Sequence, residues 1–248
     1  MQAYYFKSLP STNDKAMELA HQLTTPEFSY VVAEEQTNGR GRNGNSWSSA
    51  SGAGLYMSMI LRPELPMELL PQLTLVAGVA MCEALNALPV LAGNNVGIKW
   101  PNDILLNGRK LAGILCEASL QGDSKAVIVG IGLNVKASQE QLPARVIYPA
   151  TSLLIELGEA SVKAIDTATL AETFAVSLKQ RFLRYYSTHE IVSDWSKYDL
   201  LVDTQIKIDT PDAGVVEGVA AGITSAGELV IVDAAGDKQI ITAGSIIK

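Results

Sequence analysis

Apolar residues along the first 200 positions follow two spacings, and each predicts a different element. Continuous apolar runs predict buried strands at residues 30–34, 55–61, 96–100, 104–106, 111–116 and 126–135. Apolar residues at helical spacing predict long helices at 69–88 and 167–187. Strands with helices laid on one face of their sheet make an α+β architecture with a mixed β-sheet.

Two helix starts carry capping signals. Ser11 and Asp14 have the spacing of an acidic capping box, so a short helix is expected from there to about Leu23. Thr169 and Glu172 have the same spacing at the start of the second long helix.

The pattern changes in the last 46 residues. Short β-like runs at 205–209, 215–224, 228–233 and 238–242 are separated by turns that contain glycine, the rhythm of a small barrel. With a boundary near Leu201, residues 1–200 form the larger domain and residues 201–248 a small β-barrel.

Composition limits the partners. The 248 residues are 48% hydrophobic and 18% charged, with 19 basic against 26 acidic side chains, and the pI is about 4.9. An acidic chain is not an electrostatic DNA binder, so no DNA partner is expected. The two cysteines form no metal or disulfide spacing and fit a reducing cytoplasm. The chain contains no run of about 18 apolar residues, so no membrane partner is expected.

The cations concentrate in two segments, the first being Gly39-Arg40-Gly41-Arg42-Asn43-Gly44-Asn45-Ser46-Trp47. Alternating glycine and arginine give a loop that approaches a ligand closely while guanidinium groups bind phosphate or carboxylate oxygens. The same pattern is compatible with a solvated loop or with a patch that grips single-stranded nucleic acid.

The second segment, residues 99–115, contains Lys-Trp-Pro-Asn-Asp, an Asn-Gly turn and Lys110 in an otherwise apolar strand. Gly113 leaves room there for a ligand. An ordinary hairpin with a salt bridge would explain part of this pattern. A lysine inside an apolar strand favours function, because lysine is rarely buried unless it is paired or functional.

Together the two segments resemble biotin protein ligases. Gly39 to Trp47 matches a GRGRxGxxW-like signature, Lys99 to Asp103 matches KWPND, and Lys110 to Leu115 matches KLxGIL. Ser-Thr-Asn at 11–13 and the stretches at 130–135 and 151–153 agree as well, so the resemblance covers essentially the whole chain. Only ten residues precede Ser11, which resembles the monofunctional form without a DNA-binding domain. Asn45 departs from the family, since many relatives have arginine there. Either Arg40 and Arg42 carry more of the phosphate-binding role, or Arg109 or Arg145 substitutes for the missing cation.

The resemblance implies a catalytic domain like that of class II aminoacyl-tRNA synthetases and an SH3-like C-terminal barrel. It also implies a cytoplasmic enzyme, a monomer or homodimer, that activates biotin with ATP and Mg²⁺ to biotinyl-5'-AMP. The biotin is then transferred to a lysine of a biotin carboxyl carrier protein. Both steps need charge neutralisation and alignment more than acid–base groups, which suits a chain with two histidines.

The same resemblance implies roles for individual residues. Lys110 and Arg42 are the catalytic residues. The biotin-binding set is Ser11, Thr12, Asn13, Gln36, Gly39, Arg40, Gly41, Arg42, Trp47, Lys110 and Gly113, with Trp47 either anchoring the loop or lining the pocket. The ATP-binding set is Arg40, Arg42, Asn102, Asp103, Lys110 and Asn134, with Asp103 also the Mg²⁺ ligand. Residues 136–149 correspond to a loop that closes over adenosine.

A lipoate or octanoate ligase of the same fold is the alternative. It shares the adenylation chemistry and the strand lysine. The Gly-Arg-Gly-Arg loop and Lys-Trp-Pro-Asn-Asp favour biotin, and the histidine-rich sequence around a lipoate pocket is lacking.

Overall fold

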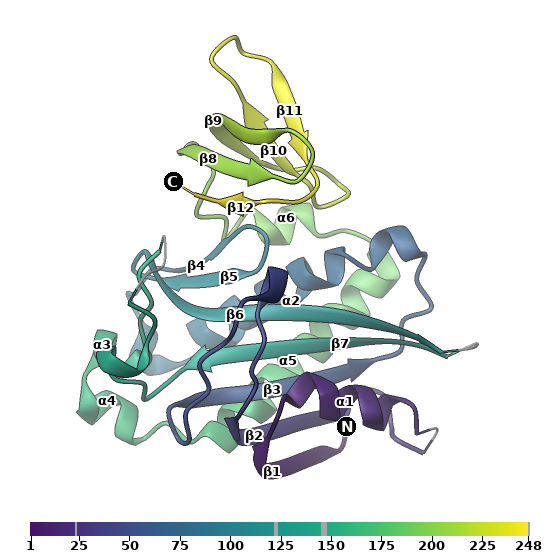
Figure 1. Cartoon of the computed structure of the whole chain (residues 1–248), viewed down its shortest axis with the longest axis vertical. Helices are drawn as coiled ribbons and strands as arrows, with labels where there is room; N and C mark the ends of the chain where they lie inside the picture. The colour runs from purple at the N-terminus through teal and green to yellow at the C-terminus, as the bar shows by residue number, and fades with distance from the viewer. Residues whose placement is uncertain (23, 122–123, 145–147, 248) are drawn as a thin grey trace.

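The computed structural model describes residues 1–248 except 23, 122–123, 145–147 and 248, and gives only the backbone of 120, 121 and 124. Two β-sheets organise the described chain (Figure 1). The larger, lower one has seven strands in the order β1-β2-β3-β7-β6-β5-β4, and the upper one has five in the order β11-β10-β9-β8-β12. The predicted α+β architecture with a mixed sheet is confirmed.

The seven-stranded sheet contains the predicted strands and one more. Its members are β1 (Ala3–Leu9), β2 (Tyr30–Gln36), β3 (Gly54–Leu61), β4 (Val96–Lys99), β5 (Asp103–Leu106), β6 (Arg109–Gln121) and β7 (Ser124–Asn134). Only β1 and β2 pair in parallel. Strand β1 was not predicted, because it lies at the sheet edge and has no buried residue, so its apolar pattern is weak.

Helices cover both faces of this sheet (Figure 1). The long helices α2 (Gln72–Asn86) and α5 (Thr167–Thr188) lie on one face, as expected. Helix α1 (Thr12–Ala20) packs on the other, against Val31, Ile60 and Ile128. The prediction of a single covered face is therefore wrong, because β2, β3 and β7 are apolar on both sides at this end. The described residues also form three short α-helices: α3 (Leu153–Leu157), α4 (Glu159–Lys163) and α6 (Val192–Trp195).

Local capping explains where the helices begin. Ser11 caps α1 by accepting a hydrogen bond from the Asn13 amide at 3.2 Å, while the Asp14 carboxylate binds Arg40 instead of completing a box. The predicted Thr169–Glu172 box is wrong, because Asp166 is the N-cap of α5 and accepts from the Thr169 amide at 2.9 Å. Helix α2 begins at Gln72 rather than 69, after Pro71. Helix α1 ends at Ala20, and Leu23 lies outside the described residues.

Helix α2 is the most apolar part of the chain. The segment Met67–Asn86 is long and apolar enough, by length and composition, to cross a membrane. However, 72% of the most apolar 18-residue stretch of this segment is buried between the sheet and α5. A central place in the core accounts for this composition.

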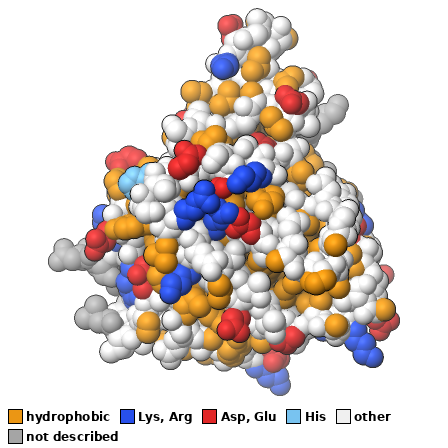
Figure 2. All heavy atoms as spheres, turned by 180° about the vertical axis from the view of Figure 1, so that it is seen from behind, with side chains coloured by type: hydrophobic (Ala, Val, Ile, Leu, Met, Phe, Trp, Pro, Cys, Tyr) orange, Lys and Arg blue, Asp and Glu red, His pale blue; other side chains and the backbone are white. Residues whose placement is uncertain are grey.

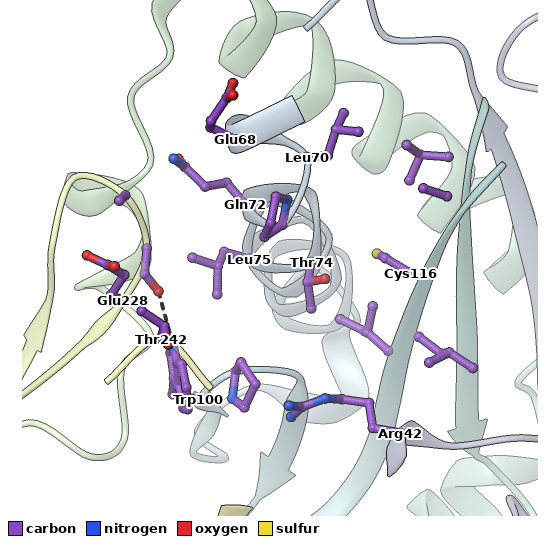
Figure 3. Close-up of a pocket in the computed structure, with 18 of the residues that line it drawn as sticks. Arg42, Glu68, Leu70, Gln72, Thr74, Leu75, Trp100, Cys116, Glu228 and Thr242 are labelled. Carbon is purple, nitrogen blue, oxygen red and sulfur yellow. Dashed lines mark hydrogen bonds between the residues drawn. The ribbon is translucent and has the colours of Figure 1, made fainter. Parts of the chain in front are cut away.

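The small C-terminal sheet is antiparallel and comprises β8 (Gln205–Thr210), β9 (Gly214–Ile223), β10 (Leu229–Val232), β11 (Lys238–Ile241) and β12 (Ser245–Ile246). The segment before it runs beside β4, where the Ile98 amide donates to the Tyr198 carbonyl at 2.7 Å. The Trp100 indole donates to the Gly227 carbonyl at 3.1 Å, the dashed line in Figure 3. These bonds hold the C-terminal sheet over residues 99–103.

Charged side chains gather on the helical face just below the C-terminal sheet (Figure 2). Ion pairs join α2, α5 and α6 in this region: Arg181 pairs with Glu83 and with Asp194, and Lys197 pairs with Asp194 at 2.9 Å. Asp194 is 3% exposed, and its pKa is lowered, because its hydrogen bond and ion pairs outweigh the effect of burial. This network ties the helices together close to the C-terminal sheet.

Candidate functional site

The face of the large sheet opposite α2 and α5 is hollowed over its central strands. There β3, β6 and β7 carry small or polar residues, namely Ser58, Gly113, Gly130, Gly132 and Asn134. A Cβ atom at Gly130 would collide with Asn13, and one at Gly132 with the Trp47 indole. The glycines therefore make room for side chains that other segments bring onto the sheet.

The start of α1 supplies a cluster of buried hydroxyl and amide groups. Ser11, Thr12 and Asn13 are each less than 5% exposed. The Thr12 amide donates to Gln36 Oε1 at 2.8 Å, and the Ser58 hydroxyl donates to Asn13 Oδ1 at 2.5 Å. These bonds fix polar groups from α1, β2 and β3 around one pocket.

The glycine–arginine loop between β2 and β3 folds as a small hairpin. Arg40 and Ser46 form a bridge, and the Trp47 amide donates to the Gly39 carbonyl at 2.9 Å. Asn45 closes the loop, since its side chain donates to the Arg42 carbonyl at 2.9 Å. The Trp47 indole lies against Gly113 and Gly132, and its Nε1 is buried with no hydrogen-bond partner among the described residues.

The two arginines of the loop have different surroundings. Arg40 is paired with Asp14 at 2.8 Å and with Glu117 at 3.0 Å. Arg42 forms no ion pair within the described ranges and donates to Asn102 Oδ1 at 3.1 Å. Burial lowers the pKa of Arg42, although Asp103 opposes this shift. Arg42 is the cation with more capacity left for an anionic ligand.

A β-bulge turns Lys110 onto the hollowed face. The register passes from Ile104 opposite Ala112 to Leu105 opposite Lys110, so β6 has one extra residue, Leu111. Without it, Lys110 would share the face of Ala112, which packs in the core. The backbone of Lys110 is also held by the Pro149 carbonyl and the Thr151 amide. Its Nζ lies 5.5 Å from the Trp47 ring centroid.

Asp103 lies between two lysines. Its Oδ1 is 2.7 Å from Lys110 Nζ, and its Oδ2 is 3.0 Å from Lys99 Nζ. Burial raises the pKa of Asp103, but the two ammonium groups outweigh it and hold the pKa below the ordinary value. The Lys99 ammonium also lies 4.7 Å from the ring centroid of Tyr148. The three charged side chains form a fixed cluster with a net positive charge.

The two predicted amides take part in backbone contacts. Asn102 Nδ2 donates to the Ile114 carbonyl at 2.8 Å, which leaves its Oδ1 to Arg42. Asn134 Nδ2 donates to the Thr151 carbonyl at 2.9 Å. Each amide is thereby held in one orientation.

Two cavities meet at these residues. The small one, about 120 Å³, is lined by Ser11, Thr12, Asn13, Gln36, Arg40, Gly41, Arg42, Trp47, Asn102, Lys110 and Gly113, among others. The larger one, about 550 Å³, is lined by Arg42, Trp47, Asn102, Asp103, Lys110 and Asn134, together with Leu142, Pro143, Tyr148 and Ala150 and with Gly244–Ile246 at the last strand of the C-terminal sheet. Among the predicted site residues, Gly39 alone lines neither, and its role is to let the loop pass Ser49 closely.

A third cavity, about 730 Å³, opens on the other side of β6, between the start of α2 and the loop at Gly227 (Figure 3). Its walls are mostly apolar, with Leu70 and Leu75 from the α2 side. Arg42 lies at its margin, as the figure shows. This side chain therefore borders all three cavities.

Several site residues had no predicted role. Lys99 and Tyr148 line the larger cavity, while Ser58 and Glu117 hold residues of the small one. Lys99 and Tyr148 had a signal, since Lys99 belongs to the second cationic segment and Tyr148 to the loop at 136–149 that the resemblance assigns to adenosine. Ser58 and Glu117 had none, because their contacts are with residues distant in sequence. Arg109 pairs with Glu156 at 3.2 Å and lines neither ligand cavity, and Arg145 lies outside the described residues.

Comparison with family models finds two matches. Residues 5–134 match the Biotin/lipoate A/B protein ligase family, and residues 204–248 match the Biotin protein ligase C terminal domain. The first match contains the loop, the strand lysine and the glycines described above.

Known proteins are similar to this chain over nearly all of its length. The Bifunctional ligase/repressor BirA of Bacillus subtilis is 39% identical over 243 residues, covering 96% of this chain and 72% of that protein. The Biotin--[acetyl-CoA-carboxylase] ligase of Mycobacterium tuberculosis is 32% identical, with coverages of 96% and 85%. The structure of biotin protein ligase from Aquifex aeolicus in complex with biotin and ATP is 27% identical, with a TM-score of 0.80 and coverages of 99% and 97%.

Proposed function

The chain belongs to the biotin/lipoate A/B protein ligase family and is a biotin protein ligase, and from this premise we propose how its own residues carry out the reaction. Biotin is placed in the small cavity, where Ser11, Thr12, Asn13 and Gln36 satisfy the polar atoms of its ureido ring. ATP is placed in the larger cavity. The complex of the Aquifex aeolicus ligase with both biotin and ATP supports a site that takes the two ligands.

One observation carries the proposal: Lys110 lines both cavities at their junction. The biotin carboxylate oxygen attacks the α-phosphorus of ATP there, and pyrophosphate leaves. Two anionic groups must approach each other, and the Lys110 ammonium lowers the energy of that approach. The acceptor lysine amine then attacks the carbonyl carbon of biotinyl-5'-AMP, and AMP leaves.

Arg42 acts beside Lys110. It borders both ligand cavities and has no carboxylate partner in the described part of the chain, so we propose that it binds phosphate oxygens. Trp47 both anchors the loop on the glycines and lines the two cavities. These contacts support a loop that retains the adenylate until the acceptor arrives.

The Mg²⁺ ion expected with ATP does not fit a site built on Asp103. Both carboxylate oxygens are engaged by lysine ammonium groups, which would repel a divalent cation. No group of three or more His, Cys, Asp or Glu residues suited to a metal occurs in the described part of the chain. We therefore assign Mg²⁺ no protein ligand.

For the acceptor we propose a biotin carboxyl carrier domain, supported by the names of relatives such as the Mycobacterium tuberculosis ligase. We also propose a cytoplasmic location. Its support is that Cys82 and Cys116 are both free thiols.

The assay that tests the proposed function is biotin-dependent exchange of pyrophosphate into ATP. We expect exchange with biotin and none without a carboxylate substrate. Octanoate and lipoate are the competing substrates, and exchange with either at the rate seen for biotin would overturn the substrate proposed here.

Gly130→Ala tests the biotin pocket. The added methyl group collides with the Asn13 side chain, so the KM for biotin is expected to rise at least about tenfold, the effect of roughly 1.4 kcal/mol. Steady-state exchange at saturating ATP measures it. The KM for ATP in the same variant is the internal control and is expected to stay within about twofold, whereas an unchanged biotin KM in Gly130→Ala would contradict the assignment.

A further inference from the structure

The carboxylate of Glu117 connects two segments that line the small cavity. Glu117, on β6, accepts a hydrogen bond from Asn13 Nδ2 at 2.6 Å and from Arg40 at 3.0 Å, both on the same oxygen. Asn13 belongs to the cluster at the start of α1, and Arg40 belongs to the glycine–arginine loop. Glu117 itself does not line either ligand cavity.

Glu117 determines which atom of Asn13 faces the pocket. Asn13 Nδ2 is used by Glu117 and by the Leu115 carbonyl at 3.3 Å. A flipped amide would place its oxygen against the Glu117 carboxylate and be repelled. Oδ1 therefore stays beside the Ser58 hydroxyl with one lone pair left. That lone pair suits an N–H donor such as one of a ureido ring.

The same carboxylate limits what Arg40 can do. Its guanidinium donates to Asp14 at 2.8 Å and to both Glu117 oxygens, at 3.0 and 3.3 Å. Although burial lowers the pKa of Arg40, these two acidic neighbours raise it on balance. With two carboxylates beside it, Arg40 has little net charge to offer a phosphate, in contrast to Arg42.

We propose that Glu117 is a positioning residue that couples biotin recognition to closure of the glycine–arginine loop, with Arg40 serving as the latch rather than as a phosphate ligand. The proposal rests on the proposed function. When biotin binds Asn13, it stabilises the orientation in which Glu117 is set to hold Arg40. Order in the loop in turn stabilises the oriented Asn13, because the coupling is reciprocal.

Glu117→Gln tests this coupling by removing the charge while keeping the size. Loss of a charged hydrogen-bond partner is expected to raise the KM for biotin about 10- to 100-fold and to leave the KM for ATP within about twofold. Release of biotinyl-5'-AMP into solution should rise in parallel. The matched control is Asp14→Asn, which also removes a carboxylate from Arg40 but whose side chain makes no hydrogen bond to Asn13 in the described structure. It should increase release and, because the coupling is reciprocal, raise the biotin KM by a smaller factor than Glu117→Gln does, since Glu117 still orients Asn13.

A double-mutant cycle with Arg40→Gln separates coupling from simple loss of structure. If Glu117 holds Arg40, the effects of Glu117→Gln and Arg40→Gln on adenylate release will be strongly non-additive. Additive effects, or equal rises in the KM for biotin and for ATP, would overturn the proposal. Absence of biotin-dependent exchange in the wild-type protein would instead refute the proposed function, so the two failures are distinguishable.

Discussion

Lys110→Ala is expected to lower the rate constant of biotin-dependent adenylate formation by about 100- to 1,000-fold, the usual effect of deleting one electrostatic contact to a transition state. The side chain lies where the two cavities meet, and a β-bulge is present to aim it there. Single-turnover formation of biotinyl-5'-AMP measures the effect. The fold should survive, because Asp103 keeps its ion pair with Lys99.

Arg109→Ala is the control for this substitution. Arg109 is the adjacent cation, but its side chain pairs with Glu156 and lines neither ligand cavity. We expect adenylate formation within about twofold of wild type, since no contact to the reacting groups is lost. A Lys110→Ala enzyme that forms adenylate within threefold of wild type would show that the assigned role is wrong.

The central strands and long helices could be predicted because their apolar periodicity is strong. The run of residues 54–61, for example, is buried throughout. Strand β1 and the two-residue strand β12 gave no such signal, because edge strands and short strands bury little surface. The face of the sheet on which α1 packs could not be predicted either. It depends on the pairing of β3 with β7, and both strands are distant from α1 in sequence.

The candidate site was predictable as far as its motifs extend. The fold places the motif residues Lys110 and Arg42 and the start of α1 around one cavity, as expected, although their roles stay predictions. The pairing of Arg40 with Asp14 and Glu117 could not be foreseen, because it joins segments 26 and 77 positions apart. The direction of the Lys110 side chain could not be predicted either, since a β-bulge moves a residue to the other face of the sheet without any change in composition.

Asp103 poses a different problem, because it stabilises the site by separating two like charges. Asp103→Asn leaves the ammonium groups of Lys99 and Lys110 side by side, with the first only 9% exposed. Removing one partner of a buried ion pair costs about 3 kcal/mol or more. We therefore expect the midpoint of thermal unfolding to fall by roughly 6–12 °C. Differential scanning calorimetry at neutral pH measures this change.

The pH dependence of the difference in stability between wild type and Asp103→Asn shows whether the charge of Asp103 causes that difference. Because the pKa of Asp103 is held below its ordinary value of 3.8 in the fold, the carboxylate stabilises the protein fully above that pH. The stabilisation is lost as the pH falls through the folded-state pKa, so wild type and Asp103→Asn should converge in acid. Adding Lys99→Met to Asp103→Asn should restore part of the lost stability, because one of the two unpaired ammonium groups is gone. A difference that is independent of pH, with no recovery in the double variant, would mean that packing, and not charge, makes Asp103 important.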